Sequence, residues 1–290
     1  MKADKKNLFE TVNFLAGLEP TRSFCNILSL DKAADYIKSR LNTLKNLKVT
    51  EQTYEVQGAT IRNIRALYNS GKAKRLIVGA HYDSDSDSET PGADDNASAV
   101  AGLLEIARML NDEKPALDYE VELVAFSLEE PPFFGYPEMG SFVHAKSLKD
   151  RNVNVIGMIC LEMIGYFNDL PVNNSVKEFK KLGLKIPEKN NFIIVLGIPE
   201  QEQFTYKVSQ LMKNSSEIEV VPVILDKRNI LSNLSDHINY WEFNFNAVMV
   251  NDTSNFRNPN YHQITDTIET LNFDKMTEVV NGVYNAVKNI

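Results

Sequence analysis

Histidine and carboxylate residues follow several apolar runs of the chain, at positions where they could bind a metal ion. The set comprises His81 and Asp83 after RLIVGA, Asp94 and Asp95 before the next helical pattern, Glu129 and Glu130 after EVELVAFS, Glu162 in ICLEMIG, and His262 in RNPNYHQITDT. If the runs are strands of one parallel sheet, their carboxyl ends meet at one edge. Carboxylates that converge in a cleft repel one another without a cation. Metal binding is therefore the chemistry that this pattern favours.

The donor types narrow the choice of metal. Imidazole and carboxylate without thiolate suit zinc, and they also permit manganese or cobalt. Two histidines with three or more carboxylates exceed what one catalytic zinc ion needs. A site with two ions that share a carboxylate is consistent with this excess.

The residues His81, Asp83 and Asp95 could also have purely structural roles. His81 and Asp83 could form a surface turn, although a carboxylate that orients a ligand imidazole recurs at zinc sites. Asp95 and Asn96 could cap the helix that is predicted to begin at Ala97. Capping does not exclude metal binding, so both interpretations stay open at this point.

The remaining residues differ in how easily a structural role explains them. Glu129 and Glu130 could end a solvated strand, but neighbours on an extended backbone point different ways, so one could bind metal while the other faces water. Glu162 lies in an apolar run, where a charged group is rarely buried unpaired. His144 is predicted to be a solvated helix residue. His237 fits either a core position or one near the substrate.

The acidic run from Asp83 to Glu89 invites comparison with a calcium-binding EF-hand loop. Its sixth position is Ser88 rather than glycine, its twelfth is Asp94 rather than glutamate, and no helix precedes it. We therefore reject an EF-hand. The motifs HExxH, GxGxxG and GxSxG and a P-loop are also absent from the sequence.

Composition excludes several classes of protein. The 290 residues include 31 basic and 39 acidic residues, for a formal net charge of −8, which argues against nucleic-acid or anionic-membrane partners. Two cysteines are too few for a disulfide scaffold. No apolar run is long enough to span a bilayer. Oligomeric state is not indicated.

The chain shows no repeat, low-complexity tract or flexible linker, so we expect one domain over residues 1–290. The N-terminus lacks the continuous apolar stretch of a signal peptide. We therefore expect a cytoplasmic protein, or a secreted or periplasmic one if a signal has been removed.

Hydrophobic periodicity predicts the elements that must position these residues. A helix is expected at 31–45, followed by three β-rich segments at 48–56, 60–68 and 75–80. Strands and helices then alternate, with strands at 120–127, 153–163, 192–197, 219–223 and 247–250 and helices at 97–110, 139–148, 200–213 and 274–288. This order predicts an α/β fold, a three-layer α/β/α sandwich around a mixed, largely parallel sheet.

Six segments in fixed order resemble the M28 family of zinc peptidases. They are GAHYDS, PGADDNAS, LEEPPFFG with MGS shortly after, LEMIGYF, SDH, and NDTSNFRNPNYHQITDT. The resemblance extends from about Leu76 to the C-terminus. It implies the fold just predicted, a zinc cofactor of one or two ions, and a peptide substrate.

Carried over position by position, the resemblance assigns a role to each candidate. It implies that His81 and Glu162 bind one ion, that Glu130 and His262 bind the other, and that Asp95 bridges both. It implies that Glu129 is the general base, that Asp83 orients His81, and that Asp94 and Asp236 are further supporting acids. Many family members carry aspartate where this chain has Glu162, which puts equal occupancy of the two positions in doubt.

The best-known members of the family are aminopeptidases, so we expect hydrolysis of peptides with a free N-terminus. Glutaminyl cyclase, a related transferase, is an alternative, but its pocket is expected to contain tryptophans, whereas the only one here is Trp241 and Tyr261 precedes His262. A non-catalytic binding module is expected to lose ligands or the base. Carboxypeptidase activity is a further alternative that the sequence leaves open. The segments 167–190 and 225–235 are expected to line the substrate pocket.

Overall fold

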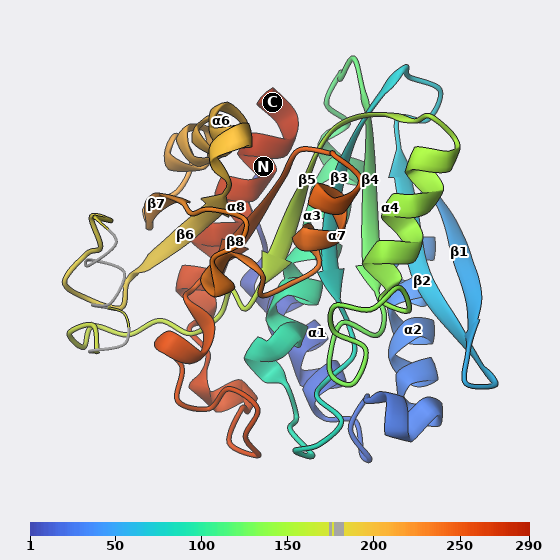
Figure 1. The fold of residues 1–290 in the computed structure, drawn as a ribbon, viewed down its shortest axis with the longest axis horizontal. Coiled ribbons are helices and arrows are strands. Elements are labelled where there is room, and N and C mark those ends of the chain that lie inside the picture. Colours follow the sequence, from blue (N-terminus) through green and yellow to red (C-terminus); the bar gives the residue numbers. More distant parts are fainter. Residues whose placement is uncertain (174–175, 177–182) are drawn as a thin grey trace.

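The computed structural model describes residues 1–173, 176 and 183–290. The segment 167–190, which was predicted to line the substrate pocket, therefore lies partly outside the described residues. Its core is one mixed eight-stranded sheet with the strand order β1-β2-β4-β3-β5-β8-β6-β7 (Figure 1). The strands are β1 (Leu47–Val56), β2 (Ala59–Tyr68), β3 (Lys74–His81), β4 (Glu120–Phe126), β5 (Asn154–Glu162), β6 (Phe192–Gly197), β7 (Glu219–Ile224) and β8 (Ala247–Asn251).

The middle of the sheet is parallel. Strand β3 pairs in parallel with both β4 and β5, and β5 pairs in parallel with β8. Strands β1, β2 and β4 form an antiparallel meander, and β6 runs antiparallel to β8 but parallel to β7. Every residue of β4 is buried, as expected for a strand covered on both faces.

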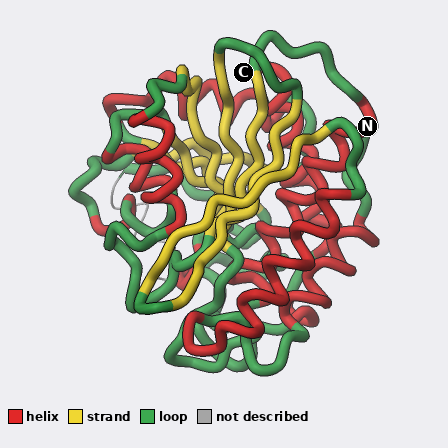
Figure 2. The backbone as a smooth tube through the Cα atoms, turned by 90° about the vertical axis from the view of Figure 1, so that its right-hand side faces the viewer, coloured by secondary structure: helices red, strands yellow, loops and turns green. Residues whose placement is uncertain are grey.

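Helices cover both faces of the sheet, unequally (Figure 2). The helices are α1 (Lys5–Ala16), α2 (Ile27–Asn42), α3 (Ala99–Glu113), α4 (Gly140–Asp150), α6 (Glu202–Lys213), α7 (His237–Glu242) and α8 (Phe273–Asn289). Apolar side chains of α1, α2, α3, α6 and α8 form one core cluster with the sheet. Residues of α4 and α7 form the other. The three layers confirm the predicted α/β sandwich.

Two helices were missed by the sequence analysis. Helix α1 is amphipathic, with Leu8, Val12 and Leu15 buried, and its N-terminus is capped by Asp4, whose side chain accepts a hydrogen bond from the backbone N–H of Lys6. Helix α7 has only six residues, too short for a periodic pattern to stand out. Helix α2 begins four residues earlier than predicted, at Ile27.

The prediction of a solvated His144 was wrong. The residue is completely buried where α4 packs on the sheet, its Nδ1 lies 2.7 Å from the Tyr240 hydroxyl oxygen, and its Nε2 lies 3.5 Å from Glu122 Oε1. The exposed Lys146 two residues on lies on the other side of the same helix, so it was a poor guide to His144. His237 is a core residue, hydrogen-bonded through Nε2 to the Ser232 carbonyl oxygen.

Within the described part of the chain, no helix is both long and apolar enough to cross a bilayer.

Candidate metal centre

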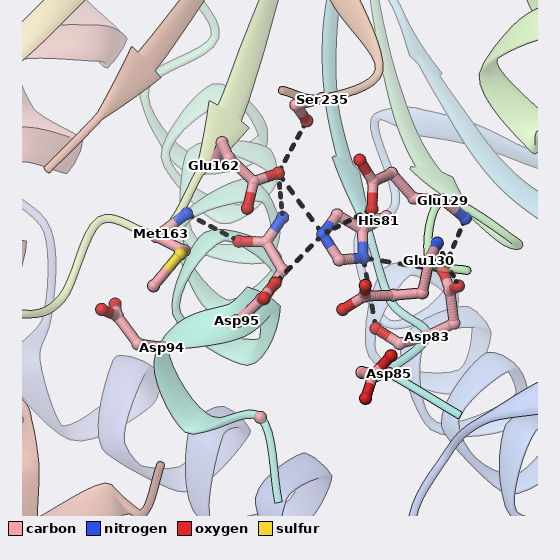
Figure 3. Close-up of polar contacts among 12 residues, drawn as sticks. His81, Asp83, Asp85, Asp94, Asp95, Glu129, Glu130, Glu162, Met163 and Ser235 are labelled. Atoms are coloured by element: carbon pink, nitrogen blue, oxygen red, sulfur yellow. Dashed lines mark hydrogen bonds and ion pairs between the residues drawn. The ribbon is translucent and has the colours of Figure 1, made fainter. Parts of the chain in front are cut away.

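The candidate residues gather at the carboxyl ends of three neighbouring strands. His81 is the last residue of β3, and Glu162 is the last residue of β5 on one side of it. On the other side, β4 ends at Phe126, and Glu129 and Glu130 follow it. Figure 3 shows these side chains turned toward one another below the strand ends. The adjacency of the strands therefore brings together residues up to 81 positions apart in the chain.

Asp95 lies between the two histidines. Its Oδ1 is 3.3 Å from His81 Nε2, and its Oδ2 is 3.2 Å from His262 Nε2. The residue belongs to the segment Ala93–Ser98, whose backbone is non-helical at Asp95 and Asn96 and leads into α3 at Ala99. Asn96 makes no N-cap bond there and contacts β5 instead. Asp95 thus presents one carboxylate oxygen to each imidazole.

Each imidazole also faces a second carboxylate. Glu162 Oε2 lies 3.3 Å from His81 Nε2, and Glu130 Oε2 lies 3.2 Å from His262 Nε2. Two groups of one imidazole and two carboxylates result, and they share Asp95. This is the pairing of residues that the sequence comparison implied, and the strand arrangement produces it.

Glu129 is a further carboxylate near the cluster, and it belongs to neither of these two groups. Its Oε2 is 3.7 Å from His81 Nε2, farther than the oxygens of Asp95 or Glu162. The side chain is almost fully buried yet lines the cavity above the cluster. It is placed to accept a proton from a molecule in that cavity.

Several atoms of the cluster have no hydrogen-bond partner. They are His81 Nε2, His262 Nε2 and Glu130 Oε1, all buried. Each is a potential metal ligand aimed into the same space, and buried polar atoms of this kind are rarely left unsatisfied. The donor set of two imidazoles and carboxylates, without thiolate, fits zinc.

The charges of the cluster residues also favour a bound metal ion. Four carboxylates, of Asp95, Glu129, Glu130 and Glu162, face two imidazoles, so the cluster is negative even if both rings are protonated. Burial and the neighbouring Asp95 charge raise the pKa of Glu130 to about 8. Although burial opposes protonation of His262, the nearby carboxylates of Asp95 and Glu130 raise its pKa to about 11. Divalent cations would replace these protons.

Asp83 connects the segments that follow strands β3 and β4. Its carboxylate accepts hydrogen bonds from the backbone N–H groups of Glu129 (3.2 Å) and Glu130 (3.1 Å). Its backbone oxygen lies 3.2 Å, and its Oδ1 3.6 Å, from His81 Nδ1. Asp83 therefore orients the ring of His81 and also holds both glutamates.

Asp94 forms hydrogen bonds with residues around the cluster rather than with the side chains of the cluster itself. Its Oδ1 accepts a hydrogen bond from the Gly165 N–H, and its Oδ2 accepts one from Asn258 Nδ2. Figure 3 shows the carboxylate directed away from His81. Sequence reasoning missed Asp266, whose buried carboxylate accepts the backbone N–H groups of both Asp94 and Asp95.

Ser235, the neighbour of Asp236, forms a hydrogen bond with a residue of the cluster. Ser235 Oγ donates a 2.6 Å hydrogen bond to Glu162 Oε2, and Asn96 Nδ2 lies 3.4 Å from the same oxygen. Asp236 is fully buried at the start of α7, but its carboxylate forms no hydrogen bond with a cluster residue. Burial raises the pKa of Asp236 to about 7. The motif SDH signalled this segment but not which of its residues makes the contact.

A cavity of about 130 Å³ opens over the cluster. Its polar wall consists of the cluster carboxylates and His262, together with Ser254 and Asn255, and its apolar wall consists of Pro131, Phe134, Leu234 and Tyr261. Leu234 comes from the predicted segment 225–235. None of the described lining residues is lysine or arginine.

Comparisons with known proteins identify the family. The model of peptidase family M28 matches residues 63–287. The chain belongs to peptidase family M28, as the resemblance of its motifs predicted. It is 39% identical over 293 residues to the uncharacterized protein YfbL of Escherichia coli, covering 99% of this chain and 88% of that protein.

Solved structures share the fold with more than one activity. The LapA aminopeptidase of Legionella pneumophila superposes with a TM-score of 0.77 at 19% identity, covering 99% of this chain and 72% of that one. The glutaminyl cyclase of Bacteroides thetaiotaomicron superposes with a TM-score of 0.72 at 21% identity, covering 100% and 99%. At these identities the similarity shows the fold alone.

Proposed function

We propose that the protein is a zinc-dependent aminopeptidase that removes residues from peptides with a free N-terminus. The observation that carries the proposal is Asp95, which presents one carboxylate oxygen to His81 and the other to His262. In this proposal His81, Asp95 and Glu162 hold one ion, and His262, Asp95 and Glu130 hold the other. Manganese or cobalt could substitute for zinc.

The residues of the cavity supply the remaining chemistry. Zinc, when bound, lowers the pKa of water and stabilises negative charge on a carbonyl oxygen. Glu129 takes the proton of the attacking water at a carboxylate oxygen and returns it to the departing amine nitrogen. Burial raises the pKa of Glu129 well above its ordinary value, which makes its carboxylate a stronger acceptor for the proton of the water.

The charge of the cavity supports action at the amino end of a substrate. Carboxyl groups outnumber the single imidazole in its lining, and none of the lining residues described is lysine or arginine, so a positively charged α-ammonium group is attracted there. A carboxypeptidase would need a cation to bind the terminal carboxylate of its substrate. The apolar wall around Phe134 and Leu234 suits an apolar side chain.

Glutaminyl cyclase activity is less well supported by the cavity. Trp241, the only tryptophan of the chain, is buried in the core formed with α7 and donates a hydrogen bond to the Ala247 carbonyl oxygen. It does not line the cavity, where Tyr261 and Phe134 are the aromatic residues. The aromatic pocket expected of the cyclase is therefore not built from tryptophan here.

A matched pair of substrates tests the proposal. Chelated protein is incubated with zinc, manganese or cobalt and a panel of aminoacyl fluorogenic amides, with and without an N-acetyl group. We expect cleavage of the free amides only. Equal cleavage of acetylated amides would contradict an aminopeptidase, and release of ammonia from a glutaminyl peptide without cleavage would establish the cyclase instead.

A further inference from the structure

Asp85 is a buried carboxylate that the assignments above leave without a role. It lies two residues after Asp83 in the loop that follows β3, and its exposed fraction is 4%. No hydrogen bond to its carboxylate is found within the described residues, and its one ion pair joins Asp85 Oδ1 to His262 Nδ1 over 3.9 Å. Burial of a carboxylate without a partner is costly. The position of Asp85 beside His262 therefore calls for an explanation.

His262 has two ring nitrogens in different surroundings. Its Nε2 faces Asp95 and Glu130, whereas its Nδ1 faces Asp85. The ring also stacks on Tyr261, with the centroids 3.8 Å apart and the planes 16° from parallel. The stacking restrains the plane of the ring but does not set its tautomer. An acceptor at Nδ1 would hold the N–H there and leave Nε2 available to a metal ion.

The other imidazole of the cluster is held in a corresponding way. His81 presents Nε2 to the cluster and Nδ1 to Asp83, whose backbone oxygen lies 3.2 Å and whose Oδ1 lies 3.6 Å from that nitrogen. Metal-binding histidines generally donate their second ring N–H to a carboxylate or a backbone oxygen, which sets both tautomer and orientation. Figure 3 shows Asp83 and Asp85 next to each other beside the cluster.

We propose that Asp85 is a positioning residue for His262: its carboxylate accepts the Nδ1–H and so presents Nε2 to the second metal position. This inference rests on the metal centre of the proposed function. One loop after β3 then orients both imidazoles, His81 through Asp83 and His262 through Asp85. Asp87, the next acid of the same loop, is exposed and forms no ion pair in the described structure, so it serves as a matched control.

Zinc binding, measured without any substrate, tests the proposal. The affinities of the two ions are determined by competition with a chromophoric chelator in wild type, Asp85→Ala, Asp85→Asn and Asp87→Ala. We expect Asp85→Ala to weaken the second ion about 10- to 100-fold and to leave the first within about twofold. Asp85→Asn keeps an acceptor oxygen and should lose less. Asp87→Ala should match wild type.

A spectroscopic measurement separates orientation of the ring from a general effect of charge. In zinc-loaded protein with ¹⁵N-labelled histidine, we expect a protected Nδ1–H signal of His262 in wild type, Asp85→Asn and Asp87→Ala. The signal should exchange rapidly in Asp85→Ala. An unchanged signal in Asp85→Ala would contradict the proposal.

A double-mutant cycle distinguishes positioning from direct binding of the ion. If Asp85 acts through His262, Asp85→Ala has no further effect on zinc affinity in a His262→Ala background. An equal loss in both backgrounds would overturn the positioning role. Wild type that binds no zinc would contradict the metal centre of the proposed function, and wild type that binds a single ion would contradict the second metal position and with it the role of Asp85. Two ions with unchanged affinity in Asp85→Ala would contradict only the role of Asp85.

Discussion

Ser235 and Glu162 are joined by a 2.6 Å hydrogen bond between two fully enclosed side chains, Ser235 Oγ donating to Glu162 Oε2. The bond leaves Glu162 with one restrained conformation although its side chain is a methylene longer than the aspartate of many family members. Glu162 Oε2 also lies 3.3 Å from His81 Nε2, the same distance as Asp95 Oδ1. A serine contributed by the segment before α7 thus restrains the glutamate at the end of β5.

Removal of this hydroxyl should weaken metal binding. We expect Ser235→Ala to lower zinc affinity at the His81 position about 10-fold, in the range observed when groups that orient a ligand are removed. Chelator competition measures the effect. Ser39→Ala, at an exposed position on α2, is the control and should bind zinc as wild type does. Equal affinities in the two variants would show that Ser235 does not orient Glu162.

The general base can be separated from the metal ligands. Glu129→Gln keeps the shape of the side chain but cannot take a proton, so turnover of an aminoacyl amide should fall at least about 100-fold. Elemental analysis should find the wild-type metal content. Glu138→Gln, in the same loop and exposed, should keep full activity. An active Glu129→Gln enzyme would show that the base is another group.

Arg22 is expected to be essential for the loop between His81 and Asp95. Its fully buried guanidinium donates hydrogen bonds to the backbone oxygens of Tyr82 (2.8 Å) and Gly92 (2.6 Å), close to both ends of that loop. Arg22→Met leaves buried carbonyl groups unpaired, and we expect a loss of at least about 3 kcal/mol in the free energy of unfolding. Urea denaturation measures it.

The matched substitution for this test is Arg228→Met, because Arg228 is exposed and its guanidinium forms an ion pair with the exposed Asp226. It should leave the urea midpoint of the protein unchanged. A similar small shift in both variants would indicate that the contacts of Arg22 do not stabilise the loop.

Acid should destabilise the protein through His237. Burial lowers its pKa to about 4, below the value of about 6.5 expected in the unfolded chain. Between these values the unfolded state binds a proton that the native state does not, so stability falls as the pH falls. From pH 7.5 to 5 this residue should cost about 2 kcal/mol.

Urea denaturation of metal-free wild type and His237→Gln at the two pH values isolates that contribution. The variant has no titrating ring and should lose about 2 kcal/mol less than wild type between pH 7.5 and 5. The same decrease in both proteins would mean that His237 is protonated equally in the native and unfolded states.

Much of the fold and of the candidate site could be predicted from the sequence. The central strands are apolar runs bounded by polar residues, so their positions were predicted to within about two residues. The placement of His81 and Glu162 at strand ends also follows from the sequence, because a charged group inside an apolar run is rarely buried unpaired. His144 shows the limit of sequence-based prediction, because an exposed lysine two residues further along a helix does not reveal which face of that helix is buried.

The residue types, their order and their positions at strand ends were determined by the sequence itself, and with them the family. Only the tertiary structure decided which partner each donor has. Ser235 and Glu162 are 73 positions apart, and Asp266 contacts Asp95 across 171. No local pattern records such pairs, because the strand order β4-β3-β5-β8 and the loops beyond it bring them together. Hydrogen bonds and ion pairs act over a few ångströms, so they depend on that arrangement and not on distance along the chain.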